Sequence, residues 1–181
     1  MSTIVATAPE SSFFELEAFD NDEPDSAAWQ YLTFTLAQEI YALGILHVIE
    51  IIEFDKITLI PMMPKCIRGV INLRGVVVPV VDLIARFGQG QTEIKQRTSI
   101  IIVDIYSSTS EKPQKVGILV DAVNEVIEIH PDTIEAPPAF GTGIRNEFIA
   151  GMAKKYEQFL VILEIKQVLA VNEIINLSIE H

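Results

Sequence analysis

The chain has 181 residues, 49% of them apolar, and a formal net charge of −12. This apolar content excludes disorder of the whole chain and suggests one domain or two very small ones. The negative charge argues against nucleic acid and anionic lipid as partners, because both carry phosphate. No apolar run approaches the roughly 20 residues needed to cross a bilayer, and residues 1–10 do not resemble a secretory signal. We therefore expect a cytoplasmic protein without direct membrane insertion.

Residues 1–28 hold seven acidic side chains and no basic one, without a sustained hydrophobic period. Such composition predicts a disordered acidic tail. Phe13, Phe14, Leu16 and Phe19 interrupt the polar sequence. They are either a short docking motif or stray apolar residues of a solvated tail.

From Tyr31 onward, short β-branched and aromatic runs alternate with Gly, Pro, Asp or Asn, which is typical of strands. We predict strands near residues 31–36, 40–46, 48–54, 69–73, 76–82, 98–105, 115–121, 123–129 and 158–164. Helical turns are expected near residues 64–67 and 146–149, with a possible C-terminal helix from about Lys166. The fold class is therefore all-β.

The segment from Gly69 to Gly88 contains two strongly apolar strands joined at Arg74-Gly75. The glycine supplies the turn between them. Pro79 has no N–H to donate, so the second strand is predicted to lie at a sheet edge or to carry a bulge there. An edge strand next to an arginine suggests a docking surface, although a turn arginine is also commonly just solvated.

An internal repeat sets the expected architecture. An offset of 75 aligns residues 43–53 with 118–128, and an offset of 82 aligns residues 67–87 with 149–169. Each copy is too small for an open sheet to cover itself, so closure into a five-stranded barrel is expected. The surplus of Ile and Val predicts a third apolar layer where the two barrels meet.

The domain organisation follows from the repeat. We expect a domain over residues 29–177, made of barrel subdomains at about 29–97 and 98–170, with possible exchange of a strand or helix between them.

Residues for catalysis or metal binding are scarce. His47, His130 and His181 have no second histidine or cysteine at ligand spacing, and Cys66 is the one cysteine in the chain. The sequence also contains no convincing phosphate-binding loop. We predict no catalytic, cofactor-binding or metal-binding residues.

Three aspartates are nevertheless candidates for acid–base catalysis. Asp82, Asp104 and Asp121 each close a β-branched run, which fits either acid–base chemistry or turn formation by a strand-end carboxylate.

Several segments together resemble CheW-like domains. Thr58 to Pro61, Pro64 to Gly69 and the following Arg74-Gly75 stretch are similar to the family's most recognisable part. Upstream, Phe34, Ile40-Tyr41 and Val48 to Ile51 follow its opening, and downstream Val116 to Val123 resembles its second-half strand pair. The resemblance covers about residues 30–170, leaving the acidic tail outside it.

This resemblance implies two packed five-stranded SH3-like barrels and a non-enzymatic chemotaxis adaptor in signal transduction. Family members couple the cytoplasmic tip of chemoreceptors to the regulatory domain of the CheA-type histidine kinase, in arrays at the membrane. Carried over by position, Arg74, Glu50 and Val48 are expected at protein-binding surfaces. Gly69, Gly75 and Gly117 match structural glycines.

Two alternatives stay open at this point. One is a CheW-like scaffold of a non-flagellar chemosensory pathway, for example surface motility. The other is a small ligand-binding or hydrolytic β-barrel protein that uses the strand-end aspartates.

Overall fold

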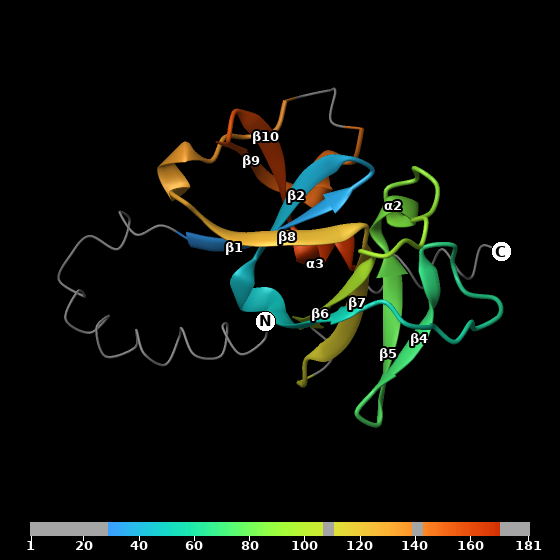
Figure 1. Ribbon diagram of the computed structural model, residues 1–181. Coiled ribbons are helices and arrows are strands. Elements are labelled where there is room, and N and C mark those ends of the chain that lie inside the picture. Colours follow the sequence, from blue (N-terminus) through green and yellow to red (C-terminus); the bar gives the residue numbers. More distant parts are fainter. Residues whose placement is uncertain (1–28, 107–110, 139–142, 171–181) are drawn as a thin grey trace.

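The computed structural model describes residues 29–106, 111–138 and 143–170. The predicted tail, residues 1–28, and the end of the expected C-terminal helix lie outside these residues. The described chain forms two five-stranded sheets with a few single-turn helices, which confirms the all-β, two-barrel fold class. Figure 1 shows the sheets as two lobes, with α3 (Ile165–Val168) at their junction.

Sheet I has the strand order β8-β1-β2-β10-β9, and sheet II has the order β3-β6-β7-β5-β4. The bounds in sheet I are β1 Trp29–Leu36, β2 Glu39–Gly44, β8 Ala122–Ile129, β9 Ile149–Lys155 and β10 Gln158–Leu163. Those in sheet II are β3 Val48–Glu53, β4 Ile67–Leu73, β5 Val76–Asp82, β6 Ser99–Ile105 and β7 Gln114–Val120. The remaining elements are α2 Leu83–Arg86 and the 3-10 turns η2 Ile45–His47, η3 Pro131–Thr133 and η4 Asn146–Phe148.

The hydrogen-bond register confirms the internal repeat. In sheet II, β5 runs parallel to β7 with Val80 opposite Gly117. In sheet I, β10 runs parallel to β2 with Ile162 opposite Ala42. These two pairs are related by the offsets of 82 and 75, so the repeats share their pairing as well as their residue pattern.

The repeats nevertheless exchange strands. Sheet II consists of strands between residues 48 and 120, whereas sheet I combines residues 29–44 with residues 122–163. The 3-10 turn η2 carries the chain from β2 in sheet I to β3 in sheet II. The division into residues 29–97 and 98–170 therefore does not coincide with the division between sheets.

Two-residue turns join three of the antiparallel pairs. Ala37-Gln38, Arg74-Gly75 and Tyr156-Glu157 all have positive φ. This is the backbone of the tight hairpin turn whose twist matches that of the flanking strands. Glycine occupies only one of the six positions, and the sheets on either side hold the others in this less favoured conformation.

The core has three apolar layers, as the composition predicted. One cluster fills sheet I around Tyr31 and Ile162, and another fills sheet II around Val78 and Ile102. The largest lies between the sheets and draws Phe34 from sheet I, Ile118 from sheet II and Val168 from α3. This shared layer joins the two sheets.

Three local expectations differ from the structure. β9 was not predicted, because its sequence, Ile-Ala-Gly-Met-Ala-Lys-Lys, has a single β-branched residue. The single turn α2, capped by Asp82, was also not predicted. Of the two positions that Pro79 allowed, an edge strand or a bulge, the edge is wrong, because β5 lies inside sheet II between β7 and β4. The β4–β5 pairing does have a register irregularity one residue away, where Val80 and Val81 face Gly69 and Ile67, and pairing with β7 begins only at Val80.

Candidate functional site

The β4–β5 hairpin places Arg74 at the surface of sheet II. Arg74 and Gly75 form the turn with φ of 52° and 88°, and the Asn72 side chain accepts a hydrogen bond of 2.7 Å from the Gly75 N–H. The Arg74 guanidinium forms an ion pair with the carboxylate of Glu50, in which Nη1 lies 3.4 Å from Oε2. Because Glu50 belongs to the edge strand β3, this pair links the two ends of the sheet order.

Exposed apolar residues follow Arg74-Gly75 in the chain. Val76 and Val77 follow the turn and are 50% and 65% exposed, while the Arg74 side chain is 70% exposed and that of Glu50 is 16% exposed. We call Glu50, Arg74, Val76 and Val77 the hairpin surface. A mostly exposed cation beside exposed valines has the composition of a protein-contact patch.

Val48 lies elsewhere. Its side chain is buried in the layer between the sheets, although the sequence placed it with Glu50 at a binding surface. A register irregularity between Val48 and Glu50 in the β3–β6 pairing explains the difference. A bulge breaks the two-residue alternation, so the two side chains no longer share a face.

The three glycines carried over from the family differ in their surroundings. A Cβ atom on Gly69 would lie 2.3 Å from the carbonyl oxygen of Thr58, and one on Gly117 would lie 2.8 Å from Ile100 Cγ2. Nothing lies within 4 Å of a Cβ atom on Gly75, so its positive φ alone disfavours other residues at this position. Gly69 and Gly117 therefore permit close packing, whereas Gly75 permits a turn.

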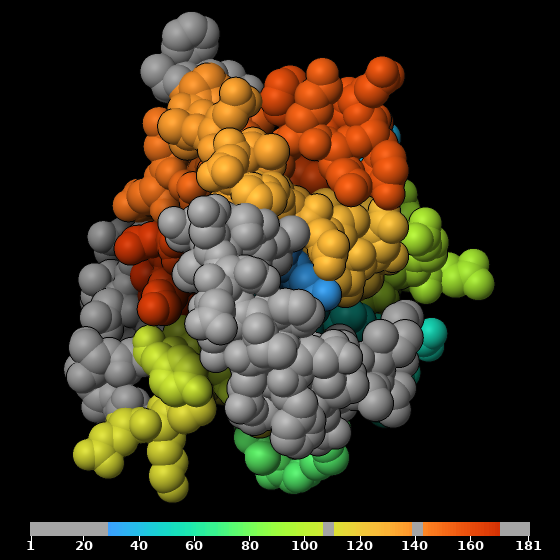
Figure 2. Space-filling model, turned by 90° about the vertical axis from the view of Figure 1, so that its left-hand side faces the viewer, coloured from blue at the N-terminus to red at the C-terminus, as the bar shows by residue number. Residues whose placement is uncertain are grey.

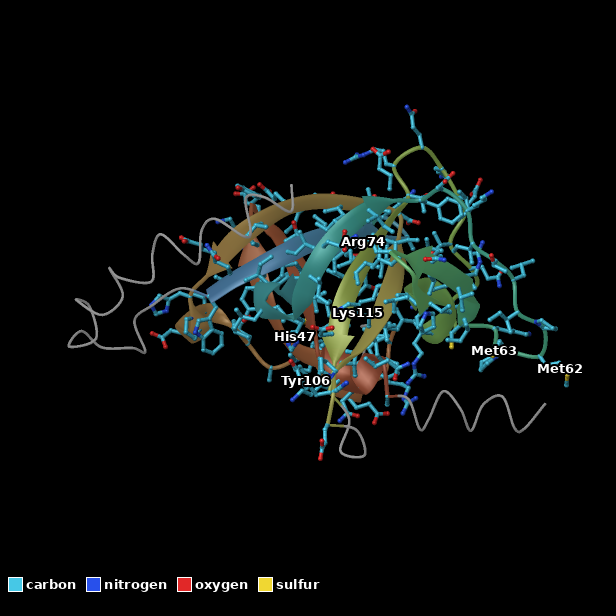
Figure 3. The ribbon with its side chains drawn as sticks, turned by 90° about the horizontal axis from the view of Figure 1, so that it is seen from below. His47, Met62, Met63, Arg74, Tyr106 and Lys115 are labelled. Atoms are coloured by element: carbon cyan, nitrogen blue, oxygen red, sulfur yellow. The ribbon has the colours of Figure 1, made fainter. Side chains whose placement is uncertain are left out.

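Two further exposed patches were not predicted. At the corner between the sheets, His47, Tyr106 and Lys115 lie near one another (Figure 3), and Leu46 beside them is 97% exposed. The loop before β4 exposes Leu59, Met62 and Met63, and Figure 3 shows its methionines far from that corner. The clue for the loop was its run of large apolar residues with no strand to bury them.

Sheet I carries a groove of about 240 Å³ between β8 and the β9–β10 hairpin. We call it the sheet I groove; its lining residues are Thr33, Ile40, Asn124, Glu125, Ile127, Lys155, Tyr156, Gln158, Phe159 and Leu160. Figure 2 shows β8, in gold, adjoining the orange residues of this hairpin. By the repeat offsets, Glu125 and Tyr156 correspond to Glu50 and Arg74.

The three strand-end aspartates are separated and do not line the groove. Asp82 is fully buried and accepts hydrogen bonds from the Ile84 N–H and from both donors of Thr92. Asp104 lies 3.5 Å from the Lys115 ammonium, and Asp121 accepts a hydrogen bond from the Ala37 N–H. Each carboxylate thus has a local structural partner, and the groove contains none of them.

No group of three or more His, Cys, Asp or Glu side chains in residues 29–106, 111–138 and 143–170 is placed to hold a metal ion. Within the same ranges, no helix is long and apolar enough to span a membrane.

Comparisons with known proteins agree with one another. The family model of the CheW-like domain matches residues 30–173. The chain is 32% identical over 149 residues to the chemotaxis protein CheW of Klebsiella aerogenes, covering 82% of this chain and 86% of that protein. It is 33% identical over 138 residues to CheW of Bacillus subtilis, covering 76% and 85% respectively.

A solved structure gives the same result. The crystal structure of the scaffolding protein TtCheW from Thermoanaerobacter tengcongensis superposes with a TM-score of 0.72 at 39% sequence identity. The match covers 83% of this chain and 92% of that one.

Proposed function

The chain belongs to the CheW-like domain family, and we propose that it is a chemotaxis adaptor that couples chemoreceptors to a CheA-type histidine kinase. Its partners are the regulatory domain of the kinase and the cytoplasmic tip of the receptors. These partners recruit it from the cytoplasm to membrane-associated arrays. It acts by binding other proteins and catalyses no reaction, so it is not an enzyme.

The hairpin surface carries this proposal. Val76 and Val77 offer apolar area that a partner can desolvate, and Arg74 offers a charge that fixes orientation. The Glu50 carboxylate holds the guanidinium in place before a partner arrives, which reduces the entropy lost on binding. Val48 supports the surface from beneath, through its packing in the layer between the sheets.

The first experiment is a titration of the purified chain with a CheA regulatory domain and, separately, with a receptor cytoplasmic tip, followed by calorimetry. We expect a complex with each partner. Absence of any kinase complex at high micromolar concentration would rule the adaptor function out.

A charge reversal tests the hairpin surface itself. Arg74→Glu is expected to weaken association with at least one partner tenfold or more, because it reverses the exposed charge and breaks the pair with Glu50. The free energy of unfolding should change by no more than about 1 kcal/mol, because the substituted Arg74 side chain is itself 70% exposed. Lys95→Glu is the matched control, since it makes the same charge change at another exposed position.

A double variant separates two roles of Arg74. Glu50→Arg combined with Arg74→Glu restores opposite charges at the two positions. Recovery of binding would indicate that the ion pair mainly positions the hairpin, whereas continued loss would indicate direct contact of Arg74 with the partner. A large loss of stability in Arg74→Glu alone would contradict a surface role.

Two alternatives were open from the sequence. The hydrolytic or ligand-binding barrel required two strand-end aspartates in one pocket, and Asp82, Asp104 and Asp121 all lie outside the sheet I groove. A non-flagellar chemosensory output, such as surface motility, keeps the same fold and partner classes. Copurification of the native complex distinguishes it from flagellar chemotaxis by identifying the receptor and kinase.

A further inference from the structure

The two repeats differ at one equivalent place. In sheet II, Arg74 on the β4–β5 turn reaches Glu50 on β3 and closes the gap between hairpin and edge strand. In sheet I the corresponding residues are Tyr156 and Glu125, and the described residues place no ion pair between them. The same gap is instead the sheet I groove. The second repeat therefore has an unfilled site where the first supplies its own side chain.

The chemistry of the groove is apolar at its floor and mixed at its rim. Ile40, Ile127 and Leu160 line it, and Phe159, which is 56% exposed, stands at its mouth. A groove of this kind fits large apolar side chains, with polar groups of the ligand left at the rim.

The charges at the rim are asymmetric. On the β9 side, the Lys154 ammonium lies 5.9 Å from the Phe159 ring centroid, and the Lys155 ammonium lies 5.3 Å from that of Tyr156. Glu125 on β8 brings negative charge to the other side, whereas Glu157 lies in the β9–β10 turn, on the same hairpin as the two lysines. A segment with aromatic side chains and a few carboxylates fits this arrangement if its carboxylates face β9.

The chain itself contains such a segment. Residues 13–19 read Phe-Phe-Glu-Leu-Glu-Ala-Phe, with three aromatic rings, one leucine and two carboxylates. The surrounding residues 1–28 contain seven acids and no base, so their charge favours the lysine side of the rim.

The stretch of chain between residues 13–19 and β1 is also long enough to let that segment reach the groove. β1 begins at Trp29, and Thr33 on the same strand lines the groove, about 13 Å further along at the usual rise per residue. The nine residues between Phe19 and Trp29 can span about 30 Å when extended. Attachment to β1 also gives the segment a high effective concentration at the groove, on the order of millimolar for a short flexible linker.

We propose that residues 13–19 dock in the sheet I groove of the same chain, with their rings against Ile40, Ile127 and Phe159 and their carboxylates toward Lys154 and Lys155. In sheet II, Arg74 links the β4–β5 hairpin to β3. In sheet I, the docked segment makes the equivalent link between the β9–β10 hairpin and β8. The inference is independent of the proposed adaptor function, because it concerns contacts within one chain.

Nuclear magnetic resonance of the full chain tests the contact. Replacement of Phe13, Phe14 and Phe19 by Ser should shift the backbone amide signals of residues lining the groove and leave those of Arg74 and Val77 in place. A synthetic peptide of residues 10–22 should bind this triple variant at least tenfold more tightly than the natural chain, whose own segment competes. Unchanged groove signals, or equal peptide affinity for both chains, would overturn the proposal.

A matched pair of variants localises the binding. Phe159 and Val77 occupy equivalent hairpin positions and are both more than half exposed. In the triple-variant background, Phe159→Lys should reduce peptide affinity tenfold or more, whereas Val77→Lys should leave it unchanged. Equal effects of the two substitutions would contradict docking in the groove.

A spin label gives a readout that leaves the groove intact. A nitroxide on Ser12→Cys should broaden the groove signals of its own chain; Cys66 is buried, which limits labelling there. In a mixture of labelled unenriched chain and unlabelled ¹⁵N-enriched chain, these signals should stay sharp. Broadening in the mixture would assign the groove to the segment of a second copy and overturn docking within one chain.

Discussion

At Gly69 the backbone φ is +149°, a conformation that side-chain-bearing residues rarely adopt. The strand β4 here passes directly against the preceding loop, where Thr58 and Val70 exchange backbone hydrogen bonds of 2.9 Å. Any Cβ atom at position 69 would push against the Thr58 carbonyl and against Ile57 Cγ2. The second repeat has the same approach at Gly151, where a Cβ atom would lie 2.4 Å from Ile134 Cγ2.

Gly69→Ala should therefore lower the free energy of unfolding by roughly 3 kcal/mol, because it combines backbone strain with a steric clash. Gly75→Ala is the matched control: its φ is also positive but nothing lies within 4 Å, so a loss of about 1 kcal/mol is expected. Urea unfolding of both variants measures the difference. Similar losses for the two would show that conformational strain, and not the contact with Thr58, dominates at Gly69.

Two tyrosines make stability depend on alkaline pH. Burial raises the pKa of Tyr41 above 10.0, with a smaller contribution from Glu39, and burial also raises the pKa of Tyr31. The folded state thus holds these protons more tightly than the unfolded state. The associated stability is fully present below pH 10 and is lost as the pH rises from there through the folded-state pKa values.

The Tyr31→Phe, Tyr41→Phe double variant should lose less stability than the natural chain between pH 8 and pH 10.5. Urea unfolding at both values measures this, and the comparison cancels the titration of the lysines. Parallel losses in the two proteins would contradict the assignment to these tyrosines.

Among the elements, α2 and α3 are equivalent single turns held in different ways. Asp82 caps α2, binds the Thr92 N–H at 2.7 Å and forms an ion pair of 2.8 Å with Arg68. Its equivalent, Glu164, makes no capping hydrogen bond to α3. There the Arg86 guanidinium donates to the Val168 carbonyl at 2.7 Å and stacks on Phe148. A side chain therefore holds each turn in addition to its backbone hydrogen bonds: the Asp82 carboxylate holds α2, and the Arg86 guanidinium holds α3.

Asp82→Ala should cost about 3 kcal/mol in free energy of unfolding, because it leaves Arg68 and the Thr92 donors without their buried acceptor. Glu164→Ala at the equivalent position should cost less than about 0.5 kcal/mol. Urea unfolding compares them. A loss for Glu164→Ala as large as that for Asp82→Ala would contradict the difference in anchoring.

The strands show how far the sequence carries the fold. β-branched runs such as those of β5 and β6 predict strands from the sequence alone. β9 has no such run, and it forms a strand because β10 pairs with it from Lys155 to Ile149. At the hairpin surface, the carried-over Arg74 and Glu50 meet in space, although 24 positions separate them. The burial of Val48 depends on the bulge in β3, and the two-residue spacing of Val48 and Glu50, which predicts one shared face, gives no sign of it.

At the scale of the molecule, the layer between the sheets makes them one cooperative unit. Phe34, Val103 and Phe148, from β1, β6 and η4, are fully buried in it. Exposing this layer by unfolding one sheet would leave the other without a large part of its apolar cover. Separation of the sheets is therefore expected to be far more costly than local fraying.

We accordingly expect one two-state transition for residues 29–170 rather than two. The calorimetric enthalpy of unfolding should equal the van't Hoff enthalpy, and circular dichroism and fluorescence of Trp29 should give coincident curves. Two resolved transitions, or a van't Hoff enthalpy near half the calorimetric one, would contradict a shared layer that couples the sheets.

The exchange of strands between the repeats also determines which sheet can be completed first during synthesis on the ribosome. All the partners of sheet II have been synthesised once β7 is complete at Val120, so its ladders need nothing that comes later. Sheet I begins with the first described strand, yet β2 gains its partner β10 only when residues 158–163 emerge. The part of the fold that is translated first is thus the part that is completed last, and in the interval the edge of β2 has no strand to pair with.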